Sequence, residues 1–329
     1  MIVVNLISRA ESGLAADVEI IASALRPAGY RVRALNTDRS RVLRLLSYVA
    51  AATRKRLGRA TIINIHCEQI AERFIDCGHR NVLVPNQEWA WPRTLELLGR
   101  MDAIFCKTRY ATGLYAAHGN AVFVGFSSHD RHDPRADKDF GAFLHVAGKS
   151  QQKGTRTLAS LWSRHPGWPT LHIVSRRQGL LDGIAGSNII HARQLSPAEL
   201  QKLQNRCGVH LCPSEAEGYG HSIGEGLGTG ALLLTTDAPP MNELVTPERG
   251  VLVPFAGTQA QGLGSNFYVD EAALEAAIVR ILGMDGATLQ ARSIAARDWY
   301  LDNRRAFVTR LTDALQALVA KGPDAGNGS

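Results

Sequence analysis

Short apolar runs alternate with helix-forming stretches through the first part of the chain, a pattern typical of parallel βαβ units. The run at 2–7 predicts a buried strand, and Val18, Ile21 and Leu25 recur at helical spacing and predict a helix over 14–25. The same reasoning predicts a basic helix near 41–56 and further strands at 30–35, 61–65, 81–84, 103–106 and 121–124.

The pattern is interrupted at 127–140, where a polar, charged stretch with a proline predicts an interdomain linker. A second α/β series follows. Ser196, Pro197 and Glu199 form a capping-box signature that starts a helix. Strands are predicted at 143–147, 170–174, 188–190, 209–211, 231–235 and 251–253, and helices at 287–299 and 303–320.

The expected fold class is therefore α/β, with two Rossmann-like domains facing across a cleft. We predict an N-terminal domain at 1–138, a second domain at 139–300, a C-terminal helix at 301–320 that packs back on the first domain, and a disordered tail at 321–329. Open parallel sheets bind ligands at the carboxyl ends of their strands, where the N–H groups of helix starts attract phosphate.

Composition is typical of a globular protein, with 329 residues, 45% of them apolar, and a net charge of +7. No apolar run approaches the roughly 18 residues of a membrane span, and the chain start has no signal-peptide pattern, so a cytoplasmic location is expected. The cysteines form no C-x-x-C pair, which gives no case for a zinc site or a disulfide framework; they are Cys67, Cys77, Cys106, Cys207 and Cys212.

The basic excess is concentrated between Arg39 and Arg59, a segment without an acidic residue. Such a segment suits an anionic membrane, a phosphorylated substrate or nucleic acid, and a plain solvated helix face is an equal alternative. Among the functional interpretations we favour a membrane surface, because leucines interleave with the arginines. That would place the protein peripherally at the inner face of the membrane. Nucleic acid is not favoured, since no stacking or helix-turn-helix motif accompanies the charge.

The segment at 212–230 carries most of the candidate chemistry. A strand ends there, a loop with Gly218 and Gly220 follows, and a helix starts near Ser222. This arrangement directs several backbone N–H groups at one point, which suits a diphosphate. Glu217 and Glu225 flank the loop with seven residues between them, and carboxylates lining a cleft accept hydrogen bonds from the hydroxyls of sugars or ribose.

This loop with its two glutamates resembles the E-x7-E signature of glycosyltransferase family 4, retaining enzymes of the two-domain GT-B architecture. Three neighbouring segments agree in order: 143–154 resembles the family's strand followed by G-R and then K-G, with Lys149 where arginine is commoner, 195–200 its short helix, and 241–254 its p-E-l-v and G-x-l-v-p stretch. Ser12-Gly13-Leu14 falls where the family has its first glycine-rich loop. The resemblance is specific in the C-terminal half of the chain and thin in the N-terminal half.

The resemblance implies a retaining transfer of a sugar from a UDP-, GDP- or ADP-linked donor to an acceptor, for example a glycan or a lipid-linked glycan. Lys149 and Lys153 would contact the donor diphosphate, Glu217 the transferred sugar and Glu225 the ribose. The N-terminal domain would be the acceptor side and the second domain would bind the nucleotide-sugar donor, with His66 facing the sugar from the N-terminal domain. The remaining donor contacts would come from Gly13 and from the loop residues Gly218, Tyr219, Gly220 and His221. The resemblance implies no metal or other cofactor.

Two other enzyme classes remain open. Gly218, Gly220 and Gly224 follow a strand, with Asp237 near the end of the next one, which partly matches an NAD(P)-binding oxidoreductase. A sugar-nucleotide epimerase shares the GT-B architecture and would act on the donor alone. Each residue also has a plain structural interpretation: the glutamates as surface ion-pair partners, the lysines as a solvated pair, and His66 as a hydrogen-bonded core histidine.

Overall fold

The computed structural model describes residues 1–9, 12–37, 41–58 and 60–320. The predicted tail at 321–329 and the two ends of the basic segment, Arg39 and Arg59, lie outside the described residues. The chain divides into two compact units. Unit 1 contains Met1–Phe126, Gly262–Gly264 and the chain from Arg304 onward, and unit 2 contains Ser127–Gln261 and Ser265–Asn303.

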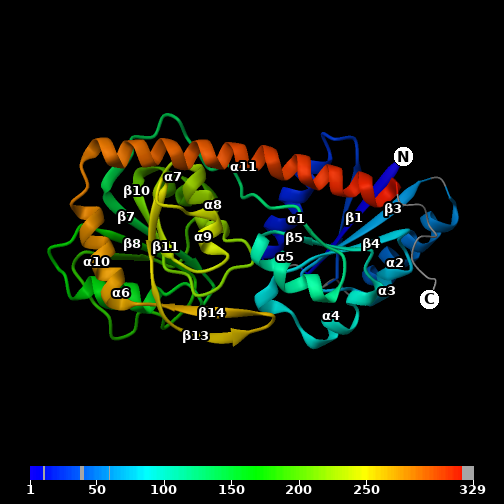
Figure 1. The fold of residues 1–329 in the computed structure, drawn as a ribbon, viewed down its shortest axis with the longest axis horizontal. Coiled ribbons are helices and arrows are strands. Elements are labelled where there is room, and N and C mark those ends of the chain that lie inside the picture. Colours follow the sequence, from blue (N-terminus) through cyan, green and yellow to red (C-terminus); the bar gives the residue numbers. More distant parts are fainter. Residues whose placement is uncertain (10–11, 38–40, 59, 321–329) are drawn as a thin grey trace. The chain divides into compact units, whose positions relative to one another are not determined.

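Unit 1 is built on a parallel sheet, part of whose strands Figure 1 labels. The strand order is β2-β1-β3-β4-β5-β6. Its strands lie where the apolar runs predict them, and its helices connect successive strands. The strands are β1 (Ile2–Ser8), β2 (Arg31–Asn36), β3 (Thr61–Cys67), β4 (Arg80–Val84), β5 (Ala103–Cys106) and β6 (Ala121–Phe123). The helices are α1 (Ser12–Leu25), α2 (Arg41–Arg56), α3 (Glu72–Ile75), α4 (Pro92–Glu96) and α5 (Arg109–Tyr115), with 3-10 turns at η1 (Gln87–Trp89), η2 (Leu98–Arg100) and η3 (Ala116–His118).

A row of buried asparagines fixes the register at the centre of this sheet. Asn5, Asn64 and Asn81 are direct partners on β1, β3 and β4. The Asn5 amide donates to Asn64 Oδ1 at 3.0 Å, and the Asn64 amide donates to Asn81 Oδ1 at 3.1 Å. Because a buried amide without a partner is costly, a slip of one strand by one residue would be strongly disfavoured.

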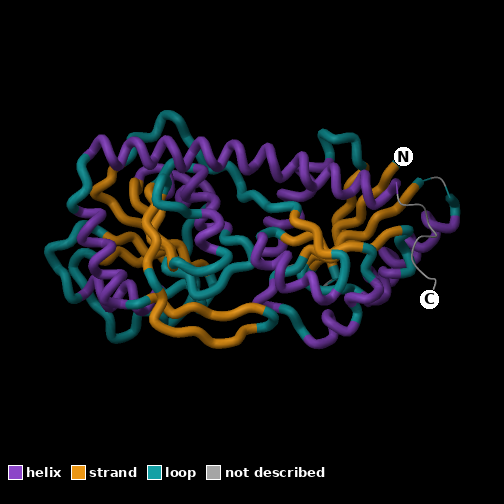
Figure 2. Tube along the Cα trace, in the orientation of Figure 1, coloured by secondary structure: helices purple, strands orange, loops and turns teal. Residues whose placement is uncertain are grey.

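Unit 2 is built on a second parallel sheet, with the order β12-β11-β10-β7-β8-β9. Helices cover this sheet, as the purple and orange tubes of Figure 2 show. The strands are β7 (Asp139–Gly148), β8 (Leu171–Ser175), β9 (Ile189–Ala192), β10 (Cys207–Cys212), β11 (Leu232–Thr236) and β12 (Gly250–Val253). The helices are α6 (Thr155–Ser163), α7 (Pro197–Arg206), α8 (His221–Gly228), α9 (Met241–Leu244) and α10 (Glu271–Leu282). The capping box predicted at Ser196 and Glu199 is confirmed at the start of α7.

Two features near the C-terminus differ from the sequence predictions. A two-stranded hairpin, β13 (Phe255–Gln261) and β14 (Gly264–Val269), follows β12 and was not predicted. Its first strand is mostly exposed and rich in small and polar residues, so it has no apolar pattern. The two predicted terminal helices are one continuous helix, α11 (Gly286–Ala320).

Helix α11 contributes to both units. Its residues up to Asn303 belong to unit 2, and those from Arg304 onward belong to unit 1. Within unit 1 the Phe307 ring packs on Phe126 at 5.1 Å between centroids, Arg310 Nε donates to the Val124 carbonyl at 3.1 Å, and Arg80 Nε donates to the Leu318 carbonyl at 3.2 Å.

Each unit is a Rossmann-like parallel sheet covered by helices, which confirms the predicted α/β class. Among the helices of the described residues, none combines the length and apolar character needed to cross a bilayer.

Candidate functional site

The loops that the sequence predicts to bind the donor leave the parallel sheet of unit 2 at the point where its strand order reverses. In unit 2 the chain builds β7, β8 and β9 outward, then returns to place β10 on the other side of β7. Strands β7 and β10 are therefore neighbours whose connections run in opposite directions. Parallel sheets bind ligands at the carboxyl ends of such strands. The loop after β7 carries Lys149 and Lys153, and the loop after β10 carries Glu217 and Gly218.

Close backbone contact holds these two loops together. Gly154 takes a left-handed conformation with φ +63°, and a Cβ there would collide with the carbonyl oxygen of Pro213. The Glu215 amide donates to the Gln152 carbonyl at 2.9 Å. Because only glycine permits both the dihedral angle and the approach, Gly154 fixes how near the lysine-bearing loop lies to the glutamate-bearing loop.

A buried histidine, His145, forms hydrogen bonds that connect the strands and the helix at this junction. His145 Nδ1 donates to the Leu211 carbonyl at 2.7 Å, and Nε2 accepts from the Thr155 hydroxyl at 2.8 Å. Burial lowers the pKa of His145 to about 4, against an opposing effect of the hydrogen bond to Leu211. A neutral imidazole with this tautomer therefore links β7, β10 and the first residue of α6.

Lys153 and Glu217 form an ion pair at the centre of the junction. Lys153 Nζ contacts Glu217 Oε1 and also lies 3.4 Å from the Ser222 hydroxyl. The side chains are only 14% and 9% exposed. Desolvated charges require compensation, and each of these two charges compensates the other. Lys149, on the same loop, is exposed.

Helix α8 begins directly after this pair. Gly220 precedes it with φ +102°, in the left-handed region that favours glycine. The residues Glu217 to Gly220 are buried, while His221 and Ser222 in the first turn are partly exposed. The first-turn N–H groups of a helix have no partner within the helix and carry a partial positive charge. Ser222, in this turn, faces the Lys153 ammonium.

Three glycines allow α8 to sink deeply into unit 2. A Cβ at Gly224 would lie 2.8 Å from the Ser128 hydroxyl, one at Gly226 would lie 2.7 Å from a His210 ring nitrogen, and one at Gly228 would lie 3.2 Å from the Tyr300 ring. Tyr219 is also buried, and its hydroxyl accepts from the Asn303 amide at 3.3 Å. The Tyr219 side chain therefore packs in the interior, leaving its backbone as the part that can contact a ligand.

Glu225 lies one turn further along α8, and protein groups hold both of its oxygens. Arg131 Nε donates to Oε1 at 3.2 Å, and the Gln204 amide donates to Oε2 at 2.8 Å. The Glu225 side chain is 12% exposed. Sequence reasoning missed Arg131 and Gln204, because no local signal connects them to a glutamate far away in the chain.

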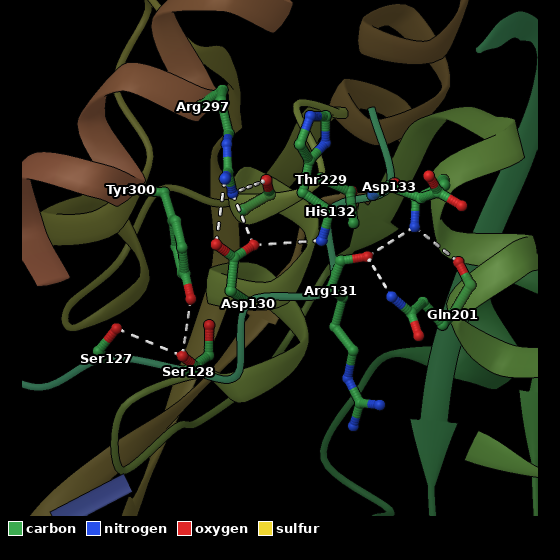
Figure 3. A network of polar contacts seen from close by, with 12 residues as sticks. Ser127, Ser128, Asp130, Arg131, His132, Asp133, Gln201, Thr229, Arg297 and Tyr300 are labelled. Carbon is green, nitrogen blue, oxygen red and sulfur yellow. Dashed lines mark hydrogen bonds and ion pairs between the residues drawn. The ribbon is translucent and has the colours of Figure 1, made fainter. Parts of the chain in front are cut away.

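The polar segment from Ser127 to Asp133 is fixed within unit 2 by the network in Figure 3. Arg297 binds Asp130 in a bidentate manner at 2.7 and 3.0 Å and also donates to the Gly228 carbonyl at 2.7 Å. The Tyr300 hydroxyl donates to the Ser128 carbonyl at 2.8 Å, and Gln201 donates to the Arg131 carbonyl at 3.1 Å. These bonds position the backbone of Arg131, and with it the guanidinium that binds Glu225.

Two predicted residues lie in unit 1. Gly13 is in the first turn of α1, directly after the segment that follows β1. His66 is completely buried on β3, where its Nδ1 accepts from the Ala71 amide at 3.1 Å. Burial lowers the pKa of His66 to about 4, partly opposed by the Asn81 side chain. The imidazole is thus neutral and closes the loop between Cys67 and Ala71.

The structure brings Lys153, Glu217 and Ser222 into contact. In the sequence, Gly218–His221 lie between Glu217 and Ser222, and Glu225 follows on α8. In the described part of the chain, no group of three or more histidine, cysteine, aspartate or glutamate side chains is arranged to hold a metal ion.

No protein-family model matches the chain, and no curated protein matches it by sequence. Solved structures do. Sucrose-phosphate synthase from Thermosynechococcus elongatus matches with a TM-score of 0.75 at 15% identity, covering 98% of this chain and 100% of that one. A glycosyltransferase from Rickettsia africae matches with a TM-score of 0.72 at 12% identity, covering 97% and 99%. Anabaena HepE, solved with UDP and glucose, matches with a TM-score of 0.66 at 12% identity, covering 95% and 99%.

These structures match nearly the whole chain, but the sequence identities are low. The matches therefore show that the fold is the same and nothing further. Together with the two parallel sheets, they establish that the chain has the GT-B fold.

Proposed function

We propose that the chain is a glycosyltransferase that uses a nucleotide sugar, and that it belongs with the retaining enzymes of glycosyltransferase family 4. One observation carries the proposal: the Lys153–Glu217 pair lies beside the start of α8, at the junction of β7 and β10. This places a cation, a carboxylate and helix-start amides at one point. A sugar diphosphate offers a complementary set, with negative oxygens and hydroxyl donors.

In the proposed reaction Lys153 binds the diphosphate and neutralises the charge that grows on it as the bond to the sugar breaks. Lys149, exposed on the same loop, adds a second ammonium. Glu217 accepts hydrogen bonds from the hydroxyls of the sugar. The two charges also compensate each other, as desolvated charges require.

Glu225 is proposed to bind the ribose, with Arg131 and Gln204 holding its carboxylate in place. A carboxylate has about four acceptor positions, so it can bind ribose hydroxyls while both protein donors remain. Backbone N–H groups from Gly218 to His221 would contact the phosphates, and Gly13 would admit the N-terminal backbone close to them. His66 would act on the site indirectly, by holding in place the loop between Cys67 and Ala71.

The oxidoreductase alternative is less consistent with the fold. A dinucleotide fingerprint belongs to the first βα turn of its sheet. In unit 2 the glycine loop follows β10, the fourth strand in chain order. The epimerase alternative acts on the same donor, so product analysis in the absence of any acceptor separates it from a transferase.

Donor binding is tested by thermal shift with UDP-, GDP- and ADP-sugars and with NADH. A true donor at 100 times its Kd should stabilise the protein by about 2.7 kcal/mol, and NADH should not. Glu225→Ala should reduce the shift, because the ribose loses its acceptor, whereas Glu271→Ala on the exposed surface of the same unit should not. A shift with NADH alone, or no shift with any sugar nucleotide, would contradict the proposed function.

We also propose that the protein works against an anionic membrane surface. The described end of α2 carries exposed Arg54 and Arg56 together with Val49 at 49% exposure, and Leu57 directly after the helix is 61% exposed. Arg33 lies on the edge strand β2, and its pKa is below the usual value. Burial is the larger cause, and the positive charges of Arg54 and Arg31 lower the pKa further. Basic groups flanking exposed apolar side chains are typical of interfacial binding.

Removing both arginines, as Arg54→Gln/Arg56→Gln, should weaken binding to vesicles that contain phosphatidylglycerol. The expected loss is about fivefold for each basic residue (about 1 kcal/mol each), measured by co-sedimentation. Arg280→Gln on α10 is the matched control and should bind as the unmodified protein does. Binding that ignores the anionic lipid content, or equal effects of the two sets of variants, would refute the membrane proposal.

A further inference from the structure

The β13–β14 hairpin passes from unit 2 into unit 1 and back. Its base is fixed in unit 2, where the Asp270 amide donates to the Pro254 carbonyl at 2.9 Å and Val269 packs against the core. The three residues of its turn, Gly262–Gly264, belong to unit 1, and the strand residues on either side belong to unit 2. Both strands are labelled in Figure 1. One hairpin therefore makes contacts within each unit.

The middle of β14 is hydrogen-bonded to both loops of the candidate donor site. The Phe267 amide donates to the Glu215 carbonyl at 2.8 Å, and the Glu215 amide donates to the Gln152 carbonyl at 2.9 Å. The Gln152 side-chain amide donates to Asn266 Oδ1 at 2.9 Å. Because Asn266 and Phe267 are adjacent, these three hydrogen bonds form a closed circuit through β14 and the two loops.

This circuit lies next to the Lys153–Glu217 ion pair in the sequence of both loops. Lys153 directly follows Gln152, and Glu217 lies two residues after Glu215. Asn266 is 7% exposed, and asparagine is a poor strand former. A buried polar side chain lowers stability unless its hydrogen bonds are made. The bond to Gln152 therefore gives a physical reason for an asparagine in the middle of β14.

The turn of the hairpin is held in unit 1 by backbone contact and by one apolar side chain. The Leu263 amide donates to the Gln87 carbonyl at 2.9 Å, and the Leu263 side chain packs against a core cluster of unit 1. Gly262 has φ +59°, and a Cβ there would collide with the carbonyl oxygens of Gln87 and Glu88. Because only glycine permits both the dihedral angle and the approach, this attachment requires Gly262.

The position of β14 depends on these attachments. A two-stranded hairpin by itself is at best marginally stable in water. Strand β13 is mostly exposed, and within the described residues no third strand joins the sheet of β13 and β14. Loss of the attachment in unit 1 would leave the hairpin fixed at its base alone, and the circuit with the donor loops would be weakened.

We propose that β14 positions the donor loops, and that its hold on them depends on the attachment of the hairpin turn in unit 1. This rests on the proposed function. Asn266 is a positioning residue, because through Gln152 it sets where the Lys153 ammonium lies relative to Glu217. A change in the segment of unit 1 that holds the hairpin turn would therefore alter turnover of the donor.

Hydrogen exchange of the full-length protein without ligand, measured by mass spectrometry, tests the attachment. Gly262→Ala should raise the exchange of the donor-loop amides at 150–154 and 213–217 about fivefold or more, because the hairpin no longer protects them. Gly257→Ala on β13 is the matched control, since a Cβ there would meet no atom within 4 Å. It should exchange as the unmodified protein does.

Two further variants separate loss of the attachment from backbone strain. Gly29→Ala places an alanine at φ +86° in unit 1, where its Cβ would meet no atom within 4 Å, and should leave exchange of the donor loops unchanged. Leu263→Ala keeps the turn and removes the side chain that packs in unit 1. It should raise exchange of the donor loops as Gly262→Ala does, and it tests the attachment if Gly262→Ala does not fold.

Turnover of the donor tests Asn266, with the UDP-, GDP- or ADP-sugar that gives the largest thermal shift. Asn266→Ala and Gln152→Ala should each lower kcat for release of nucleoside diphosphate about fivefold, the loss of one hydrogen bond, with a smaller change in KM. The double variant should lose no more than either single variant, because both substitutions remove the same bond. Gln259→Ala, which removes an exposed hydrogen bond from Tyr268 in the same hairpin, should keep the full rate.

Equal exchange in Gly262→Ala and Gly257→Ala would overturn the proposal, as would kcat losses of Asn266→Ala and Gln152→Ala that add in the double variant. The exchange measurement needs no donor, so it separates this proposal from the proposed function. If Gly262→Ala speeds exchange of the loops and no sugar nucleotide binds, the positioning stands and the transferase proposal is wrong. If a sugar nucleotide is turned over and Gly262→Ala matches Gly257→Ala in exchange and kcat, the positioning is wrong and the transferase proposal stands.

Discussion

Replacing Lys153 with methionine is expected to slow cleavage of the sugar nucleotide by about 10²- to 10³-fold, the usual effect of removing one group that stabilises transition-state charge. Lys153 is the ammonium in contact with Glu217, and Lys149 lies exposed on the same loop. Methionine keeps the length and apolar stem of the side chain while removing the charge. Since charge on the diphosphate grows during bond breaking, the rate should fall more than donor affinity.

The measurement is the release of nucleoside diphosphate at saturating donor, together with the Kd of the donor from thermal shift. Lys202→Met, an exposed lysine on α7 of the same unit, serves as the control and should keep the full rate. Lys153→Arg should recover part of the rate, because the charge returns with a different shape. Equal rates for Lys153→Met and Lys202→Met would remove Lys153 from the catalytic site.

The sequence was sufficient for the strands and for the position of the donor loops. Buried parallel strands are short apolar runs, and each of the twelve strands in the two large sheets lies at a predicted run. The loop at Gly218 and Gly220 was also recognisable, because glycines between a strand and a helix are a local signal. Local signals of this kind depend only on neighbouring residues.

The contacts that complete the candidate site are long-range and leave no such signal. Arg131 lies in a polar stretch interpreted as a linker, yet its guanidinium binds Glu225, 94 residues away. Arg297 binds Asp130 over a separation of 167 residues. Charged residues are abundant on any surface, so a pairing between two of them is defined only once the fold brings their backbones together.

The β13–β14 hairpin and the continuity of α11 show the same limit in secondary structure. Phe255–Gln261 is predominantly exposed, so no alternation of apolar and polar residues marks it as a strand. Asp302 and Asn303 are weak helix formers, but α11 continues through them. Packing on the two units outweighs a propensity difference of a few tenths of a kcal/mol per residue.

Replacing Lys107 with methionine is expected to destabilise unit 1 by about 3–5 kcal/mol, the cost of leaving a buried charge without its partner. Lys107 Nζ lies 2.5 Å from Asp17 Oδ2, and the two side chains are 2% and 3% exposed. The ammonium also donates to Asn86 and lies 4.8 Å from the centre of the Phe126 ring. Methionine would fill much of the space but leave the Asp17 carboxylate desolvated.

Urea denaturation followed by circular dichroism measures this loss, with the first transition assigned to the unit that contains the substitution. Arg93→Met provides the comparison, because the Arg93 side chain is 62% exposed and pairs with Glu72 on the surface of the same unit. Exposed pairs contribute at most about 1 kcal/mol. If the two variants lose similar stability, the Asp17–Lys107 pair is not the desolvated pair that the structure describes.

The double variant Asp17→Leu/Lys107→Met distinguishes between two explanations for the lower stability of Lys107→Met. If the cost comes from the buried carboxylate that has lost its ammonium, removing both charges should recover most of the stability, since apolar replacements of a buried pair are often neutral or stabilising. If the pair itself supplies the stability, the double variant should be at least as unstable as Lys107→Met. Recovery would further indicate that the pair is retained for a purpose other than stability.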